Sequence, residues 1–88
     1  MPTVKLFGGL RNHVENHELN LPGETVQAIL DQLCQGRDDL KAAIFDGPDL
    51  AAHVRVMVNG RDIGLAQGLA TEVSQDDQIA IFPPIAGG

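Results

Sequence analysis

Tryptophan and tyrosine are absent from this sequence of 88 residues, and only three phenylalanines are present. Aliphatic side chains must therefore fill most of the interior, so any phenylalanine outside that interior is informative. Apolar residues still make up 43% of the chain, which is enough for a globular core and too many for a disordered chain. A chain of this length fits one domain with one core.

Cysteine is also scarce, because Cys34 is the only one and no internal disulfide can form. A single thiol fits the reducing cytosol. The first residues lack the charged-then-apolar pattern of a signal peptide, and no apolar run approaches the ~18 residues that span a bilayer. These absences predict a cytoplasmic protein with no membrane partner.

Positive charge is in short supply: six Lys and Arg face twelve Asp and Glu, for a formal net charge of -6. Phosphate backbones repel such a surface, so we expect no nucleic-acid partner. An acidic surface instead favours a protein partner with a basic docking patch.

Hydrophobic periodicity places the first elements. Alternation predicts strands over residues 3–7 and 18–21. A helix then starts at Thr25 as its N-cap and ends before Gly36. A second short helix is predicted over residues 38–45. The main helix carries one apolar stripe, formed by Val26, Ile29, Leu30 and Leu33.

The second half of the chain contains only strands in this reading. They cover residues 53–58, 61–63 and 78–82, and Asn59-Gly60 forms the hairpin turn between the first two. The last strand can be central only by pairing with the first. We therefore predict an α+β fold, the β-grasp of ubiquitin. It has a mixed sheet of four to five strands, one main helix packed across it and a short second helix.

Strand parity also predicts an exposed cluster. Phe7, Met57 and Phe82 lie on the side of the sheet that faces away from the helix, and Leu10 and Ile85 are expected to extend them. An exposed apolar patch is typical of a partner surface. The alternative is that a loop covers these side chains as a minor core.

The last seven residues, 82–88, read Phe-Pro-Pro-Ile-Ala-Gly-Gly. This ending, with residues 4–7, 58–63 and 68–71, resembles the sulfur carriers typified by ThiS and by MoaD, the small subunit of molybdopterin synthase. The likeness covers nearly the whole chain. It is strongest from residue 54 onward and weakest over residues 35–52.

The resemblance implies a carrier that is not itself an enzyme and binds no cofactor. An activating enzyme of the ubiquitin-activating type, similar to MoeB or ThiF, would use ATP to adenylate the terminal carboxylate of Gly88. Sulfur would then replace AMP to give a thiocarboxylate. Gly87 and Gly88 suit this role because they lack Cβ atoms and can enter a narrow slot. Pro83 and Pro84 end the strand and hold the tail extended.

The expected division of the chain is a β-grasp domain over residues 1–84 and a flexible tail over residues 85–88. The expected site residues fall into two groups. Gly87 and Gly88 take part in activation. The partner-binding residues are Phe7, Met57, Phe82, Pro83, Pro84 and Ile85.

Several functions stay open within and beyond this family. The Phe-Pro-Pro sequence favours molybdopterin biosynthesis, with the large catalytic subunit of molybdopterin synthase as partner. Other sulfur-accepting enzymes would serve cysteine biosynthesis, thiamine synthesis or tRNA thiolation. A different class is a protein modifier joined through Gly88 to lysines. A third is a β-grasp binding module with an inert tail.

Other candidate sites are weaker. His13 and His17 stand four residues apart, but their order does not match a zinc motif and no third ligand is nearby, so we expect no metal site. Cys34 adjoins the apolar stripe of the helix and has acidic neighbours, which disfavour a thiolate. His53 is expected at the surface, at the start of a strand.

Overall fold

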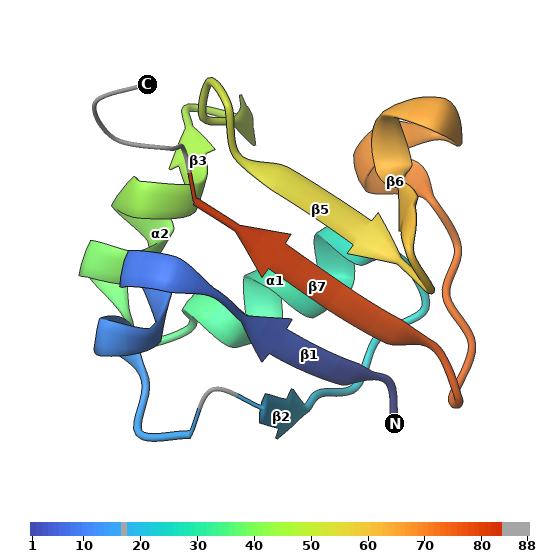
Figure 1. The fold of residues 1–88 in the computed structure, drawn as a ribbon, viewed down its shortest axis with the longest axis horizontal. Coiled ribbons are helices and arrows are strands. Elements are labelled where there is room, and N and C mark those ends of the chain that lie inside the picture. The colour runs from blue at the N-terminus through green and yellow to red at the C-terminus, as the bar shows by residue number, and fades with distance from the viewer. Residues whose placement is uncertain (17, 84–88) are drawn as a thin grey trace.

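A parallel pair of strands lies at the centre of the sheet and joins the two ends of the chain (Figure 1). The structure is a computed structural model that describes residues 1–16 and 18–83. Strand β1 (Thr3–Leu6) runs parallel to β7 (Gln78–Phe82), with Val4 opposite Ile79 and Leu6 opposite Ile81. The predicted pairing of the first and last strands is confirmed.

Three further strands complete a five-stranded sheet in the order β2-β1-β7-β5-β6. Strands β2 (Glu18–Asn20), β5 (Arg55–Val58) and β6 (Arg61–Asp62) all pair antiparallel to their neighbours. The turn between β5 and β6 has φ values of 52° at Asn59 and 84° at Gly60, as a tight hairpin requires. This mixed sheet with a helix across it is the predicted β-grasp.

Helix α1 (Val26–Cys34) covers one face of this sheet (Figure 1). Thr25 is its N-cap, as predicted, because its side-chain oxygen accepts a hydrogen bond from the Ala28 amide at 3.2 Å. Gly36 follows the helix with φ +74°, a conformation that favours glycine. The four stripe residues are all fully buried, and the core beneath them contains Val4, Leu6, Val56, Ile79 and Ile81.

Helix α2 (Asp38–Ile44) is one residue shorter than predicted. Its Leu40 and Ile44 are buried, but Phe45 is half-buried and begins β3 (Phe45–Asp46), which pairs with β4 (Asp49–Leu50). None of the helices in the described ranges has the length and apolar character needed to cross a membrane.

Three short 3-10 helices were not predicted: η1 (Gly8–His13), η2 (Ile63–Leu65) and η3 (Gly68–Ala70). Such turns are too short to show a hydrophobic period.

Local turns make two of the expectations from the sequence wrong. Leu10 does not extend the exposed cluster, because η1 carries it into the core and leaves it only 3% exposed. His53 is exposed, but it lies in a turn with φ 68° and does not start a strand.

A hydrogen-bonded corner connects the β5–β6 turn to the start of β7. The Asp77 carboxylate accepts from the Ser74 amide at 2.7 Å and from the Asn59 side chain at 2.9 Å. Both hydrogen bonds lower the pKa of Asp77 below its ordinary value of 3.8, and the one from the Ser74 amide has the larger effect. The corner sets where β7 enters the sheet.

Replacing Asp77 by Ala is expected to lower the free energy of unfolding by about 1 kcal/mol near neutral pH. Because the folded-state pKa is depressed, this contribution is complete above the unfolded-state pKa and is lost as pH falls through the folded-state value. Urea denaturation of both proteins between pH 7 and pH 2 measures the difference. Asp76→Ala removes the neighbouring carboxylate and should change the free energy of unfolding little. An equal loss in both variants would contradict the prediction.

Candidate functional site

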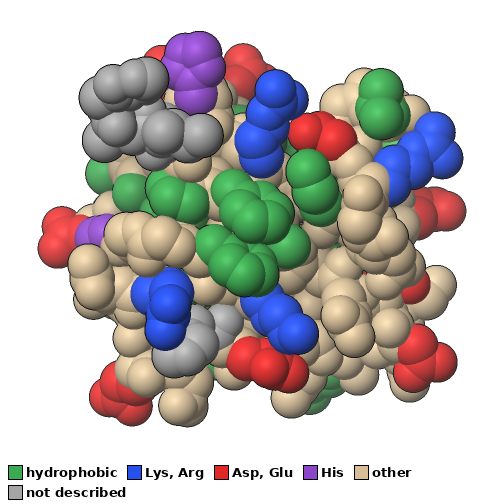
Figure 2. Space-filling model, in the orientation of Figure 1, with side chains coloured by type: hydrophobic (Ala, Val, Ile, Leu, Met, Phe, Trp, Pro, Cys, Tyr) green, Lys and Arg blue, Asp and Glu red, His purple; other side chains and the backbone are tan. Residues whose placement is uncertain are grey.

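The face of the sheet that is turned away from α1 carries an apolar patch. Figure 2 shows hydrophobic side chains gathered near the middle of this face. Phe7, Met57 and Phe82 lie here, as strand parity predicts, and we call them the open-face cluster. Phe7 is 38% exposed, and the other two are half-buried. An apolar group of this kind on an accessible face can bind a protein partner.

The two aromatic rings of the cluster are stacked. The ring centroids of Phe7 and Phe82 lie 4.6 Å apart with an angle of 12° between the ring planes. The backbone holds them in this position, because the Phe7 amide donates to the Ile81 carbonyl at 3.1 Å and extends the β1–β7 ladder. Met57 is on the adjacent strand β5, diagonal to Phe82. Three strands distant in sequence thus build one surface.

Basic side chains border the open-face cluster (Figure 2). Arg55 lies opposite Phe82 and forms an ion pair with Asp62 at 3.3 Å. Lys5 and Arg11 line a shallow pocket beside Phe7, together with Glu18. The charged groups named here are three cations and two carboxylates, so the charge beside the cluster is mixed, whereas the whole chain has a net charge of -6.

The strand that leads to the glycine tail ends at the same cluster. Pro83 is half-buried and directly follows Phe82. Its ring lies against the backbone of Gly8, where a Cβ atom on Gly8 would stand 2.7 Å from Pro83 Cγ. The remaining predicted site residues lie outside the described residues: Pro84, Ile85, Gly87 and Gly88.

Two features of this site were not found from the sequence. The contact between Gly8 and Pro83 joins residues 75 positions apart, and the positive φ of Gly8 is not visible in a sequence. In the sequence, Gly8-Gly9 indicates only the end of the strand predicted over residues 3–7. The basic border was missed because it depends on which charged residues share a face, although the strand parity of Lys5 and Arg55 carried that signal.

Metal-ligating residues do not gather elsewhere in residues 1–16 and 18–83. No group of three or more His, Cys, Asp or Glu side chains in these ranges could hold a metal ion. His13 lies at the end of η1, and His17 lies outside the described residues.

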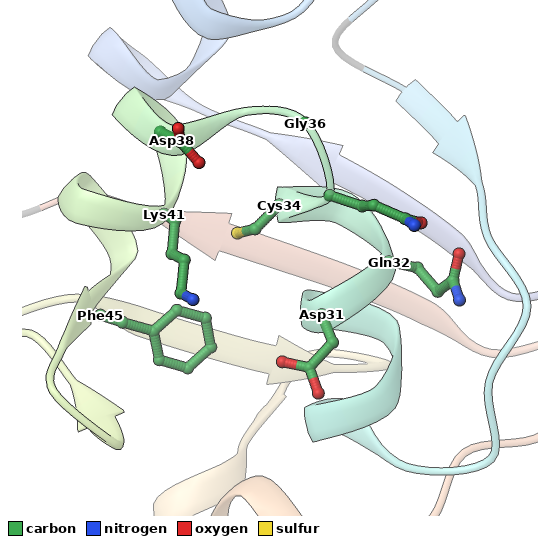
Figure 3. A pocket seen from close by; sticks show the side chains of 8 residues that line it. Asp31, Gln32, Cys34, Gly36, Asp38, Lys41 and Phe45 are labelled. Carbon is green, nitrogen blue, oxygen red and sulfur yellow. The ribbon is translucent and has the colours of Figure 1, made fainter.

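The only thiol lies in a pocket between α1 and α2. Figure 3 shows Cys34 pointing from α1 toward α2, with Asp31 and Lys41 nearby. The pocket has a volume of about 470 Å³, and the Cys34 residue is 6% exposed. Burial raises the pKa of the Cys34 thiol above 9.0, and the Asp31 carboxylate raises it further, against smaller opposing effects of Lys41 and Arg37. The thiol is therefore protonated and weakly nucleophilic near neutral pH.

Comparison with known proteins assigns the family. The sequence profile of the ThiS family matches residues 4–88, which is nearly the entire chain. The chain belongs to the ThiS family.

Two curated relatives of this ThiS-family protein indicate what such chains do. A putative sulfur carrier protein of Archaeoglobus fulgidus is 41% identical over 61 residues, which cover 69% of this chain and 67% of the relative. Small archaeal modifier protein 3 of Haloferax volcanii is 34% identical over 64 residues, which cover 73% of this chain and 70% of the relative. The family therefore includes sulfur carriers and ubiquitin-like modifiers.

Solved structures share the fold over the full chain. The crystal structure of the Amycolatopsis orientalis BexX/CysO complex contains a chain with a TM-score of 0.89, 30% identity and full coverage of both chains. A putative molybdopterin converting factor subunit 1 of Pyrococcus furiosus gives a TM-score of 0.70 at 28% identity, covering 96% of this chain and 97% of that one. These likenesses support the ubiquitin-like β-grasp fold and the carrier class.

The Cys34 thiol of the ThiS-family protein is expected to react with iodoacetamide at least ~10-fold more slowly in the folded chain than in urea at pH 8. The rate in the folded protein should keep rising with pH above 9.0, because the pKa of the thiol is raised above that value. Intact mass spectrometry over time measures both rates. Equal rates in the folded and unfolded chains would show that the thiol is accessible and ionised.

Proposed function

We propose that this protein is a sulfur carrier whose working group is the carboxylate of Gly88. The observation that carries the proposal is the family match, which extends through residue 88 and so includes the Gly-Gly pair. The relative of Archaeoglobus fulgidus, described as a putative sulfur carrier, supports the same class. The open-face cluster next to Pro83 supplies a surface on which such a chain can be held by its enzymes.

The proposed cycle has two covalent steps on a partner enzyme similar to MoeB or ThiF. The Gly88 carboxylate attacks the α-phosphorus of ATP, and pyrophosphate leaves to give an acyl adenylate. A hydrosulfide ion then adds to the carbonyl carbon, AMP leaves, and a thiocarboxylate remains at Gly88. Adenylation is needed because a free carboxylate has no good leaving group. The carrier contributes its carboxylate and its docking surface, while the enzyme binds ATP.

The open-face cluster also defines the chemistry of the partner surface. Phe7 and Phe82 offer a stacked aromatic pair, and aromatic side chains dominate the energetics of many interfaces. Lys5, Arg11 and Arg55 border this pair. We propose that the activating enzyme presents an apolar surface with acidic groups at its edge, since opposite charges favour encounter and register. This replaces the basic partner patch expected from the net charge.

The pathway that receives the sulfur is a separate question. Phe82-Pro83-Pro84 favours molybdopterin biosynthesis with the large subunit of molybdopterin synthase as acceptor, and this stays a prediction. The likeness to the CysO chain is structurally stronger, with a TM-score of 0.89 against 0.70 for the molybdopterin converting factor subunit. We therefore propose a sulfur-accepting enzyme of the kind that a CysO-like carrier serves as the first acceptor to test.

A second candidate function is protein modification through Gly88. The 34% identity to small archaeal modifier protein 3 favours it specifically. The two functions share the adenylate and differ in the next nucleophile, which is sulfur for a carrier and a lysine amine for a modifier. Incubation with ATP, the activating enzyme and either sulfide or target protein separates them. A thiocarboxylate adds 16 Da to the free chain, since sulfur replaces oxygen, whereas an isopeptide bond joins the chain to its target.

Gly88→Ala is expected to reduce thiocarboxylate formation at least ~100-fold while the free energy of unfolding changes by less than ~0.5 kcal/mol. The added Cβ obstructs the narrow path that the two glycines suit. Intact mass after reaction with ATP, sulfide and the activating enzyme measures loading. Gly9→Ala is the control, because a Cβ there meets no atom within 4 Å and Gly9 is not among the glycines with positive φ. Normal loading of Gly88→Ala would refute the steric role of this residue.

Phe82→Ala is expected to weaken binding to the activating enzyme by ~1–3 kcal/mol. Its effect on folding should be smaller than that of Ile81→Ala, which removes a fully buried side chain from the same strand at a cost of ~2–5 kcal/mol. Titration calorimetry and urea denaturation measure the two quantities. Leu65→Ala serves as the binding control, since Leu65 is an exposed apolar residue outside the open-face cluster. Phe82→Ala binding as tightly as the wild type would exclude the cluster as the docking face.

A further inference from the structure

The glycine that follows β1 lies directly beside the proline that follows β7. Figure 1 shows that β1 and β7 run side by side in the same direction. Their register places residue 8 next to residue 83 where the two chain segments leave the sheet. An ideal Cβ on Gly8 would stand 2.7 Å from Cγ and 3.2 Å from Cδ of Pro83. Real Cβ atoms do not approach other heavy atoms as closely as the first of these distances. Because Gly8 has no side chain, the Pro83 ring can occupy the space that a Cβ atom on residue 8 would need.

Gly8 cannot easily move away from this contact. On one side the Phe7 amide is bonded to the Ile81 carbonyl at 3.1 Å, and the Phe7 ring is stacked on Phe82. On the other side Gly8 begins η1, which is anchored in the core by Leu10 at 3% exposure. Its φ of +59° also favours glycine at this position. A Cβ atom on residue 8 would therefore push Pro83 aside, while the backbone of residue 8 would stay in place.

We infer that Gly8 is a positioning residue that sets the direction in which the chain leaves β7 at Pro83. This inference rests on the proposed function, since it assigns Gly8 to the delivery of Gly88 to the activating enzyme. The open-face cluster would hold the domain on the enzyme, and the contact between Gly8 and Pro83 would aim the residues that follow. Small errors in the placement of a reacting group reduce rates strongly without weakening binding.

Gly8→Ala is expected to lower kcat for thiocarboxylate formation by about 10–100-fold, while KM stays within about twofold because the docking side chains are unchanged. Intact mass measured over a range of carrier concentrations separates kcat from KM. A loss of folding or docking would instead raise KM or reduce the amount of folded protein, which circular dichroism measures.

Two glycines of this chain are matched controls. Gly68 has φ +60°, almost identical to Gly8, but a Cβ there meets no atom within 4 Å. Gly68→Ala therefore introduces the same backbone strain without a contact to Pro83. Gly9 is adjacent to Gly8, and a Cβ on it also meets nothing within 4 Å. Both control variants should load at the wild-type kcat.

Pro83→Ala provides the test of the contact itself, because it removes the two ring atoms that the new Cβ would strike. In this background Gly8→Ala should reduce kcat by less than about threefold. A reduction as large in the Pro83→Ala background as in the wild-type background would overturn the inference, and so would a Gly8→Ala variant that loads like Gly68→Ala.

A measurement without the enzyme keeps this inference distinct from the proposed function. Gly8→Ala should shift the NMR signals of Phe82 and Pro83 in the free chain, whereas Gly68→Ala should not. If the wild type forms no thiocarboxylate, the proposed function fails, and these shifts still decide whether Gly8 sets the position of Pro83. Unchanged signals at Phe82 and Pro83 in Gly8→Ala would overturn the inference.

Discussion

The parallel pairing of β1 with β7 determines the position of every other element of the sheet. It brings the first and last strands of the chain to the centre of one sheet, with Leu6 opposite Ile81. A parallel connection cannot be made by a tight turn, so the chain must cross the sheet between these strands, and α1 does so while covering the core. The same pairing places Phe7 against Phe82 and Gly8 against Pro83. Core, docking face and root of the tail therefore follow from one register.

Alternation along β7 divides its side chains between stability and recognition. Ile79 and Ile81 point into the core and are fully buried, whereas Phe82 points to the open face. In the proposed cycle the chain meets an activating enzyme and then an acceptor, and this division would let the open face stay apolar while α1 and the core maintain the fold. The phenylalanines follow the same division between core and open face, since two of only three stack on the open face.

Local charge at the open face differs from the charge of the whole chain. The acidic residues outnumber the basic ones two to one in the whole chain, yet Lys5, Arg11 and Arg55 border the open-face cluster together with only Glu18 and Asp62 among the carboxylates named there. Screening limits the reach of exposed charges to about 10 Å in ordinary buffers, so a docking partner responds to the nearby border more than to the distant carboxylates. The net charge of a small domain is therefore a poor guide to the sign of a particular surface.

Local periodicity and turn chemistry were enough to predict the β-grasp class, the stripe of α1, the Thr25 cap and the alternation of β1, β5 and β7. Parity also predicted the open-face cluster. The positions of Leu10 and His53, the 3-10 turns and the contact of Gly8 with Pro83 could not be predicted in this way. Each depends on a positive φ or on the packing of residues distant in sequence. Such constraints leave no periodic pattern, and a glycine that makes room for a proline 75 residues away looks the same as one that ends a strand.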